Sequence, residues 1–257
     1  MKQLMFRDDP AFWFETLRNL GLAAYGGSDV GEVIATTSRV TPGDYDGWHD
    51  AWLATAQRLE TEARGGHPIS ARDGLLRASS YYRAAEFFLH GNPDDPRIDH
   101  AYKRGVACFR DAITQLPDVT PVEIPYEDTV LRGYFYRATG TGPKPTLVMH
   151  NGFDGAAEEL HFFGALGGQE RGYNVLTFDG PGQTWPSTGT GWPSGRTGRT
   201  WSVPSWTSSS GTRASIRAAS RCSASASAAT SRPARPPTSR AWRPSWPSTV
   251  SSTPSPP

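Results

Sequence analysis

Two short glycine-containing loops hold the residues of this sequence whose types and spacing could do chemistry. The first is residues 150–155 (HNGFDG), and the second is residues 178–183 (FDGPGQ); each closes an apolar run. Glycine lets a backbone approach a reacting group closely, and a loop after a strand can turn its N–H groups toward a developing oxyanion in acyl transfer. Loops at the ends of strands are also where α/β sheets bind ligands. Both segments are therefore candidates for contact with a substrate.

The polar and aromatic side chains in and near these segments also have an ordinary structural explanation. His150 could bond to nearby backbone at the end of a strand as readily as shape the loop. Asp179 is expected to cap its loop rather than act as a catalytic acid. Glu158 and Glu159 are expected on the solvated face of the next helix. The aromatic pairs are expected to pack helices together; they are Trp48/Trp52, Tyr81/Tyr82 and Phe87/Phe88.

The elements that carry the two loops follow a strand–helix–strand pattern. Residues 119–126 and 129–138 read as two strands joined by a turn at Glu127-Asp128. The apolar run 145–152 predicts a buried strand of a largely parallel sheet, and residues 173–183 predict another. Between them, residues 156–171 read as a helix that places Leu160, Phe163 and Leu166 on one face. The three together make a βαβ unit.

Four amphipathic helices are predicted before the strands. Residues 10–22 and 44–64 show apolar residues at helical spacing, and Arg58, Glu60 and Glu62 are expected away from the apolar face of the second. Ser70 and Asp73 resemble a capping box ahead of a third helix that Gly91-Asn92-Pro93 ends. A fourth covers about 95–116. Its Cys108 is expected to be buried as a small apolar residue.

In the order of these elements and loops, the chain resembles the α/β-hydrolase superfamily, in particular the branch with an N-terminal helical cap that includes the pseudooxynicotine hydrolases and related esterases. The resemblance covers about residues 10–183, and FDGPGQ after a strand is its more specific motif. It implies a serine hydrolase acting on an ester, amide or activated C–C bond of a small organic substrate. It also implies that Gly152, Phe153 and Asp154 form the oxyanion loop, although an ordinary tight turn stays open there.

The triad that the resemblance implies has no place in this sequence. A Ser nucleophile should sit in a Gly-x-Ser-x-Gly elbow after the second loop, followed by an acid and a His. No such elbow is present, and no Asp, Glu or His follows Asp179. The chain as written is therefore expected to be inactive. No metal or organic cofactor is implied.

The composition changes abruptly after Gln183. Residues 184–257 contain no Asp, Glu, Lys, Asn, Gln, His, Leu, Met, Phe or Tyr, but they hold nine of the 26 Lys and Arg residues. All 25 acidic residues lie earlier, so the first part carries 17 − 25 = −8 and the tail +9. Such a tail cannot bury enough apolar area to fold, and we expect it to be irregular.

A shifted reading frame explains this composition. If the true frame starts one base earlier, residues 184–191 permit M-A-L-Y-R-D-G, and residues 222–230 permit F-G-V-S-L-G-G-Y. The second string is a nucleophile elbow whose serine codon spans Ser225 and Ala226. The sequence therefore indicates a hydrolase gene that is frameshifted after Gln183, by sequencing error, by decay to a pseudogene or as a real product.

The alternative is a non-catalytic helical interaction module whose basic tail binds nucleic acid or another anionic partner. We disfavour it because the tail has no Lys and because a frameshift accounts for Arg, Trp and Ser together. No signal peptide or bilayer-spanning run is evident, which predicts a soluble cytoplasmic protein without membrane or nucleic-acid partners. The expected fold class is α/β: a helical cap over 1–118, the first part of a hydrolase domain over 119–183, and an irregular tail over 184–257. The oligomeric state and the substrate are left open.

Overall fold

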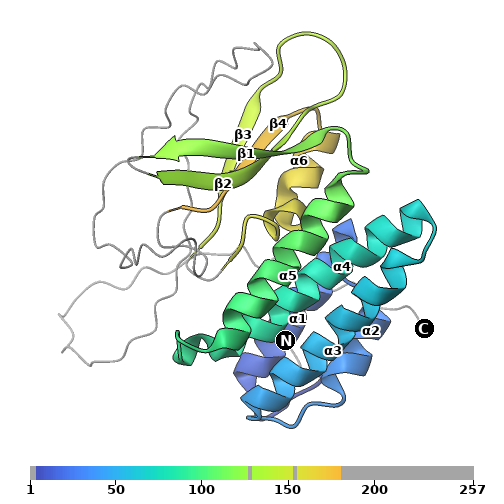
Figure 1. Cartoon of the computed structure of the whole chain (residues 1–257), viewed down its shortest axis with the longest axis vertical. Coiled ribbons are helices and arrows are strands. Elements are labelled where there is room, and N and C mark those ends of the chain that lie inside the picture. Colours follow the sequence, from blue (N-terminus) through green and yellow to red (C-terminus); the bar gives the residue numbers. More distant parts are fainter. Residues whose placement is uncertain (1–3, 127–128, 153–154, 181–257) are drawn as a thin grey trace, which may run out of the picture. The chain divides into compact units, whose positions relative to one another are not determined.

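The computed structural model describes residues 4–126, 129–152 and 155–180 (Figure 1). The predicted turn at Glu127-Asp128 and the predicted irregular tail over 184–257 lie outside these ranges. Five α-helices precede the strands within them. They are α1 (Pro10–Gly21), α2 (Val30–Thr37), α3 (Tyr45–Arg64), α4 (Pro68–Glu86) and α5 (Pro96–Ile113), with short 3₁₀ turns at Leu22–Tyr25 and Phe87–Gly91.

Aspartate caps set where four of these helices begin. The side chains of Asp9, Asp29, Asp44 and Asp95 each accept a backbone N–H from the first turn of α1, α2, α3 and α5, respectively. Such caps satisfy N–H groups that have no partner inside the helix. The predicted capping box at Ser70 and Asp73 is wrong, because α4 begins earlier, at Pro68 with His67 as its cap.

Aromatic side chains build the core between the helices, as the sequence predicted. Trp48 and Trp52 of α3 are fully buried with ring centroids 5.6 Å apart, and Tyr81 of α4 lies 5.2 Å from Trp52. Glu60 does not lie away from this face. It is buried, and it accepts a hydrogen bond from Tyr82 at 2.6 Å, so that prediction is wrong.

The four strands form one mixed sheet in the order β1-β2-β4-β3. The strands are β1 (Val119–Tyr126), β2 (Thr129–Tyr136), β3 (Thr146–His150) and β4 (Asn174–Phe178). Only the β3–β4 pair is parallel; β1–β2 and β2–β4 are antiparallel. Within the described ranges, the expected largely parallel sheet is therefore wrong, although the βαβ unit itself is confirmed.

The strand order also changes which strand lies at the edge. Because β4 inserts between β2 and β3, β4 is the buried strand and β3 borders the described sheet. Leu147 of β3 is 40% exposed. The prediction of a buried strand at 145–152 is therefore wrong. The buried strand predicted within 173–183 is confirmed over Asn174–Phe178, and residues 181–183 lie outside the described ranges.

The connection between β3 and β4 is shorter and less regular than a single helix over 156–171. A π-helical turn spans His161–Ala165, and α6 follows at Leu166–Glu170. A π turn advances the chain by more residues than an α turn, which shifts every later side chain around the axis. Consequently Phe162 is buried and Phe163 is 47% exposed, so the predicted apolar face is wrong at Phe163.

Candidate active site

The two candidate loops begin side by side at one edge of the sheet. In the parallel β3–β4 pair, His150 is in register with Phe178, and their rings lie 6.1 Å apart. Asn151 and Asp179 are therefore the first residues beyond two neighbouring carboxyl ends. This is the edge at which parallel α/β sheets bind ligands.

His150 is bonded locally rather than into a catalytic arrangement among the described residues. Its exposed ring places Nδ1 2.9 Å from the backbone oxygen of Asn151, the ordinary structural contact that the sequence left open. Asp179 is buried, and its backbone N–H donates to Arg132 O at 3.0 Å, which extends the β2–β4 pairing into the loop.

The glycines shape the loop after β3. A Cβ atom on Gly155 would lie 2.7 Å from Cγ and Oδ1 of Asn151, so only glycine lets that buried side chain fold back against the loop. Gly152 is exposed, with open space where a side chain would be. Phe153 and Asp154 lie outside the described residues, so the oxyanion role of Gly152, Phe153 and Asp154 stays a prediction.

Glu158 and Glu159 are buried, contrary to the expectation that they face solvent. Their exposed fractions are 8% and 4%. The helix that should have carried them outward begins only at Leu160, and residues 157–159 form a turn. Both carboxylates consequently lie in the buried turn that follows Gly155 and Ala156.

Glu159 is compensated by two arginines from the helical region. Its Oε2 atom lies 2.9 Å from Arg18 Nη2 of α1 and 3.2 Å from Arg83 Nε of α4. The same oxygen accepts the backbone N–H of Ala156 at 3.1 Å. A buried carboxylate needs such partners, because removing a charge from water is costly unless it is paired and hydrogen-bonded.

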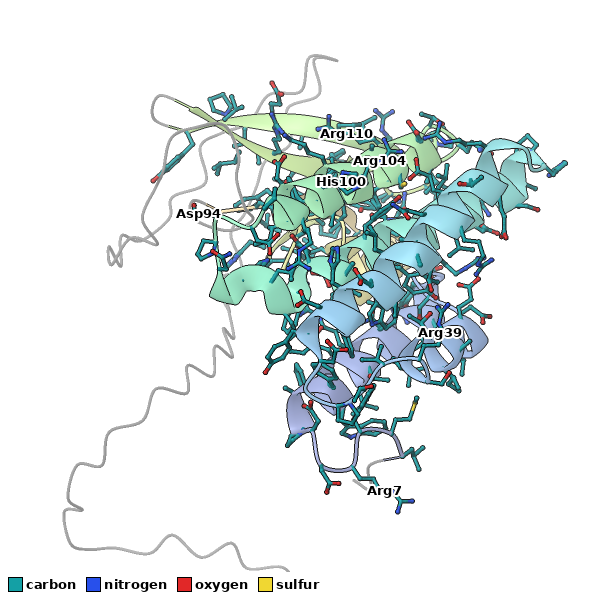
Figure 2. All side chains as sticks on the ribbon, turned by 60° about the horizontal axis from the view of Figure 1, so that its bottom comes forward. Arg7, Arg39, Asp94, His100, Arg104 and Arg110 are labelled. Carbon is teal, nitrogen blue, oxygen red and sulfur yellow. The ribbon has the colours of Figure 1, made fainter. Side chains whose placement is uncertain are left out.

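Glu158 has a different environment although it is the adjacent residue. Tyr134 of β2 donates its hydroxyl to Glu158 Oε1 at 2.5 Å, and Oε2 has no partner among the described residues. Burial raises the pKa of the Glu158 carboxyl, and the Tyr134 hydrogen bond and the charge of Arg110 partly oppose that rise. Figure 2 shows Arg110 on α5.

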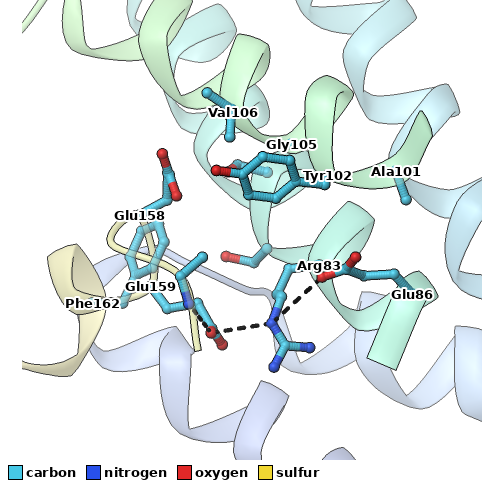
Figure 3. A pocket seen from close by; sticks show the side chains of 12 residues that line it. Arg83, Glu86, Ala101, Tyr102, Gly105, Val106, Glu158, Glu159 and Phe162 are labelled. Carbon is cyan, nitrogen blue, oxygen red and sulfur yellow. Dashed lines mark hydrogen bonds and ion pairs between the residues drawn. The ribbon is translucent and has the colours of Figure 1, made fainter. Parts of the chain in front are cut away.

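A small cavity separates these carboxylates from α4 and α5 (Figure 3). Its volume of about 20 Å³ leaves room for about one water molecule and none for an organic substrate. Several of the residues that line it have polar side chains; they are Ser79, Ser80, Arg83, Glu86, Tyr102, Glu158 and Glu159.

Two further titratable groups are buried in the core. His161 is fully buried with Nδ1 3.2 Å from the Tyr136 hydroxyl, and burial lowers the pKa of the imidazole to about 3. Burial likewise raises the pKa of the Cys108 thiol to about 11, which fits its predicted packing role. In the described ranges, no group of three His, Cys, Asp or Glu residues could hold a metal ion. No described helix is long and apolar enough to cross a bilayer.

Two curated proteins that match this chain in sequence are both named as hydrolases. The protein named hydrolase acrC of Aspergillus aculeatus is 43% identical over 201 residues, covering 70% of this chain and 47% of the relative. The protein named alpha/beta hydrolase xenA of Xenoacremonium sinensis is 37% identical over 192 residues, covering 70% of this chain and 44% of the relative. The chain thus spans less than half the length of these curated relatives. No family profile matches it.

A solved structure matches as well. The crystal structure of the 2,6-dihydroxy-pseudo-oxynicotine hydrolase superposes with a TM-score of 0.53 at 27% identity, covering 64% of this chain and 46% of that one. The helices, the mixed sheet and these matches together support an α/β-hydrolase fold, part of which lies in the described residues. The predicted resemblance and fold class are confirmed.

Proposed function

We propose that this chain derives from a serine hydrolase that cleaves an ester, amide or activated C–C bond of a small organic substrate. The observation that carries the proposal is the pair of loops after β3 and β4, which begin side by side at the carboxyl edge of the β3–β4 pair, in a chain whose sequence matches curated hydrolases. In this proposal, residues 1–118 form a cap and residues 119–183 the first part of the hydrolase domain.

The reaction would proceed by acyl transfer. A serine would attack the substrate carbonyl carbon while a histidine takes its proton, and backbone N–H groups near Gly152, Phe153 and Asp154 would hold the oxyanion. Collapse of the tetrahedral intermediate would release the leaving group, and water would then hydrolyse the acyl-enzyme. The neighbouring carboxyl edges of β3 and β4 support this placement of the loop.

We also propose that the written chain is inactive because its reading frame changes after Gln183. Support comes from the sequence: neither an elbow nor a later acid or histidine is present, and the shifted frame permits G-V-S-L-G across codons 223–228. The substrate partner is proposed to be a small molecule, with neither nucleic acid nor membrane involved.

Two proteins test the proposal: the written chain, and the protein from a gene shifted by one base after codon 183. The second should turn over p-nitrophenyl acetate, and the first should not exceed its heat-denatured control. Replacing by Ala the serine encoded across codons 225 and 226 should lower kcat of the shifted protein by about 10⁶-fold. Equal turnover by both proteins would overturn the frameshift, and an inactive shifted protein would overturn the assignment of a serine hydrolase. Resequencing codons 180–190 gives an independent check.

A further inference from the structure

We infer that Glu159 is a positioning residue: through a single carboxylate oxygen it ties Ala156, the first residue after the HNGFDG loop, to helices α1 and α4. The inference rests on the proposed hydrolase function, because it assigns a purpose to the shape of that loop.

Three donors converge on one atom. Glu159 Oε2 lies 2.9 Å from Arg18 Nη2, 3.2 Å from Arg83 Nε and 3.1 Å from the backbone nitrogen of Ala156. Figure 3 shows the contact with Arg83. Ala156 follows the glycine that ends the HNGFDG loop. A change in the position of either arginine is therefore transmitted to the backbone of the loop through one carboxylate.

The arginines are themselves held by the helical region. Arg18 lies 5.7 Å and Arg83 5.0 Å from the centroid of the Phe87 ring, which follows α4 directly. Arg18 also pairs with Glu15 at 3.5 Å, and Arg83 with Glu86 at 4.0 Å. Because a guanidinium group in contact with an aromatic ring is restrained in orientation, the helical region helps to hold both donors in place.

An oxyanion loop acts only if its N–H groups are held in place before the reaction. Strand β3 ends at His150, so the sheet fixes the start of the HNGFDG loop. The Ala156–Glu159 hydrogen bond closes the turn behind the loop, and the two ion pairs hold that turn against the helices. Glu159 thus restrains the far end of the loop, as the strand restrains its near end.

The test is hydrogen exchange of the full 257-residue chain, resolved for peptides that cover 151–160. Glu159→Met removes both the charge and the acceptor at similar length and should speed exchange in these peptides by at least about 10-fold, the factor that corresponds to about 1.4 kcal/mol. Glu159→Gln retains an acceptor oxygen and should speed it less. Exchange in strands β1 and β2 should rise less than exchange at 151–160, because only the loss of global stability reaches them.

The coupling to the helices has its own variants. Arg83→Met should also speed exchange at 151–160, and adding it to Glu159→Met should have less than an additive effect, as expected for groups in one network. If Arg83→Met does not fold, Arg83→Lys, which keeps the charge, takes its place. Glu62→Gln is the matched control, because Glu62 pairs with Arg58 at 2.9 Å on the exposed surface of α3.

Two results would overturn the inference. One is unchanged exchange at 151–160 in both Arg83→Met and Arg83→Lys, because this would show that the loop is not coupled to the helices. The other is an equal increase in every element, which would make Glu159 a general stability contact. The measurement uses no substrate, so its failure would leave the hydrolase assignment standing, and an inactive frame-restored protein would leave this coupling standing.

Discussion

Replacing Glu158 by Gln should remove one specific pH dependence of stability. The Glu158 carboxyl is buried, one oxygen has no partner in the described structure, and burial raises its pKa. The folded protein therefore retains a proton that the unfolded chain gives up near pH 4.5. Between the unfolded and folded pKa values, the free energy of unfolding falls as pH rises, by about 1.4 kcal/mol per pH unit from this group.

Glutamine imitates the protonated carboxyl in shape and can still accept the Tyr134 hydroxyl. Glu158→Gln should therefore match the parent chain at low pH and become progressively more stable than it as pH rises through the folded pKa of Glu158. Urea unfolding at low protein concentration, followed by Trp fluorescence from pH 4.5 to 8 at fixed ionic strength, measures the difference. The contributions of the other titrating groups to the free energy of unfolding are the same in both proteins and cancel in that difference.

The adjacent residue gives the control. Glu159→Gln breaks a buried pair with Arg18 and Arg83 and should cost about 3–5 kcal/mol, as is typical when one partner of such a pair is removed. The two variants make the same chemical change at adjacent residues. If the free energy of unfolding at pH 7 rises in one and falls in the other, the difference would reflect the environments of the two carboxyls alone. If Glu158→Gln destabilises the chain more at pH 8 than at pH 4.5, the reasoning about Glu158 is wrong.

Three other outcomes follow from the fold. Strand β3 borders the described sheet, and an unpaired strand edge invites association, so we expect the written chain to aggregate. Leu147→Lys on β3 should lower that aggregation; light scattering that does not change with the substitution would count against this. Trp48→Ala removes a buried indole whose Nε1 donates to Ala84 O at 2.8 Å, and it should cost about 3–5 kcal/mol in urea unfolding; a loss below 1 kcal/mol would contradict the described packing. The Cys108 thiol, with its pKa raised to about 11, should react with a disulfide reagent at pH 8 only as fast as the chain opens; labelling at the rate of the urea-unfolded chain would show that it is not buried.

The sequence predicted the elements well because their signals are local. Proline, aspartate and glycine mark the ends of α1 and α5, and the apolar spacing of Trp48 and Trp52 identifies the buried face of α3. The two strands before the hydrolase motif were predicted within two residues, since alternation and a polar turn are also local features. Helix α2 was not predicted, because its eight residues are too few to show a clear period.

The errors have long-range causes. Glu158 and Glu159 were placed on a solvated face because no local pattern reveals that Arg18, 141 residues earlier, reaches Glu159. The burial of Glu60 likewise depends on Tyr82 from another helix. The edge position of β3 depends on the strand order, which an apolar run cannot reveal. The only signal in the sequence for the burial of Glu158 and Glu159 was a pair of acidic residues directly after an oxyanion-type loop. A solvent-facing helix could carry the same pair, so the signal does not distinguish the two cases.

The insertion of β4 between β2 and β3 makes the sheet dependent on its last strand. During synthesis, β1 and β2 can pair as soon as both have emerged, whereas β3 has no neighbour until residues 174–178 follow it. Contacts that close late and over long separations slow folding. A truncation before Asn174 would thus remove more than an edge: it would leave β3 with no strand to join, and the loop after it with no fixed origin. Residue 178 is therefore the earliest boundary at which a shortened chain could keep this sheet.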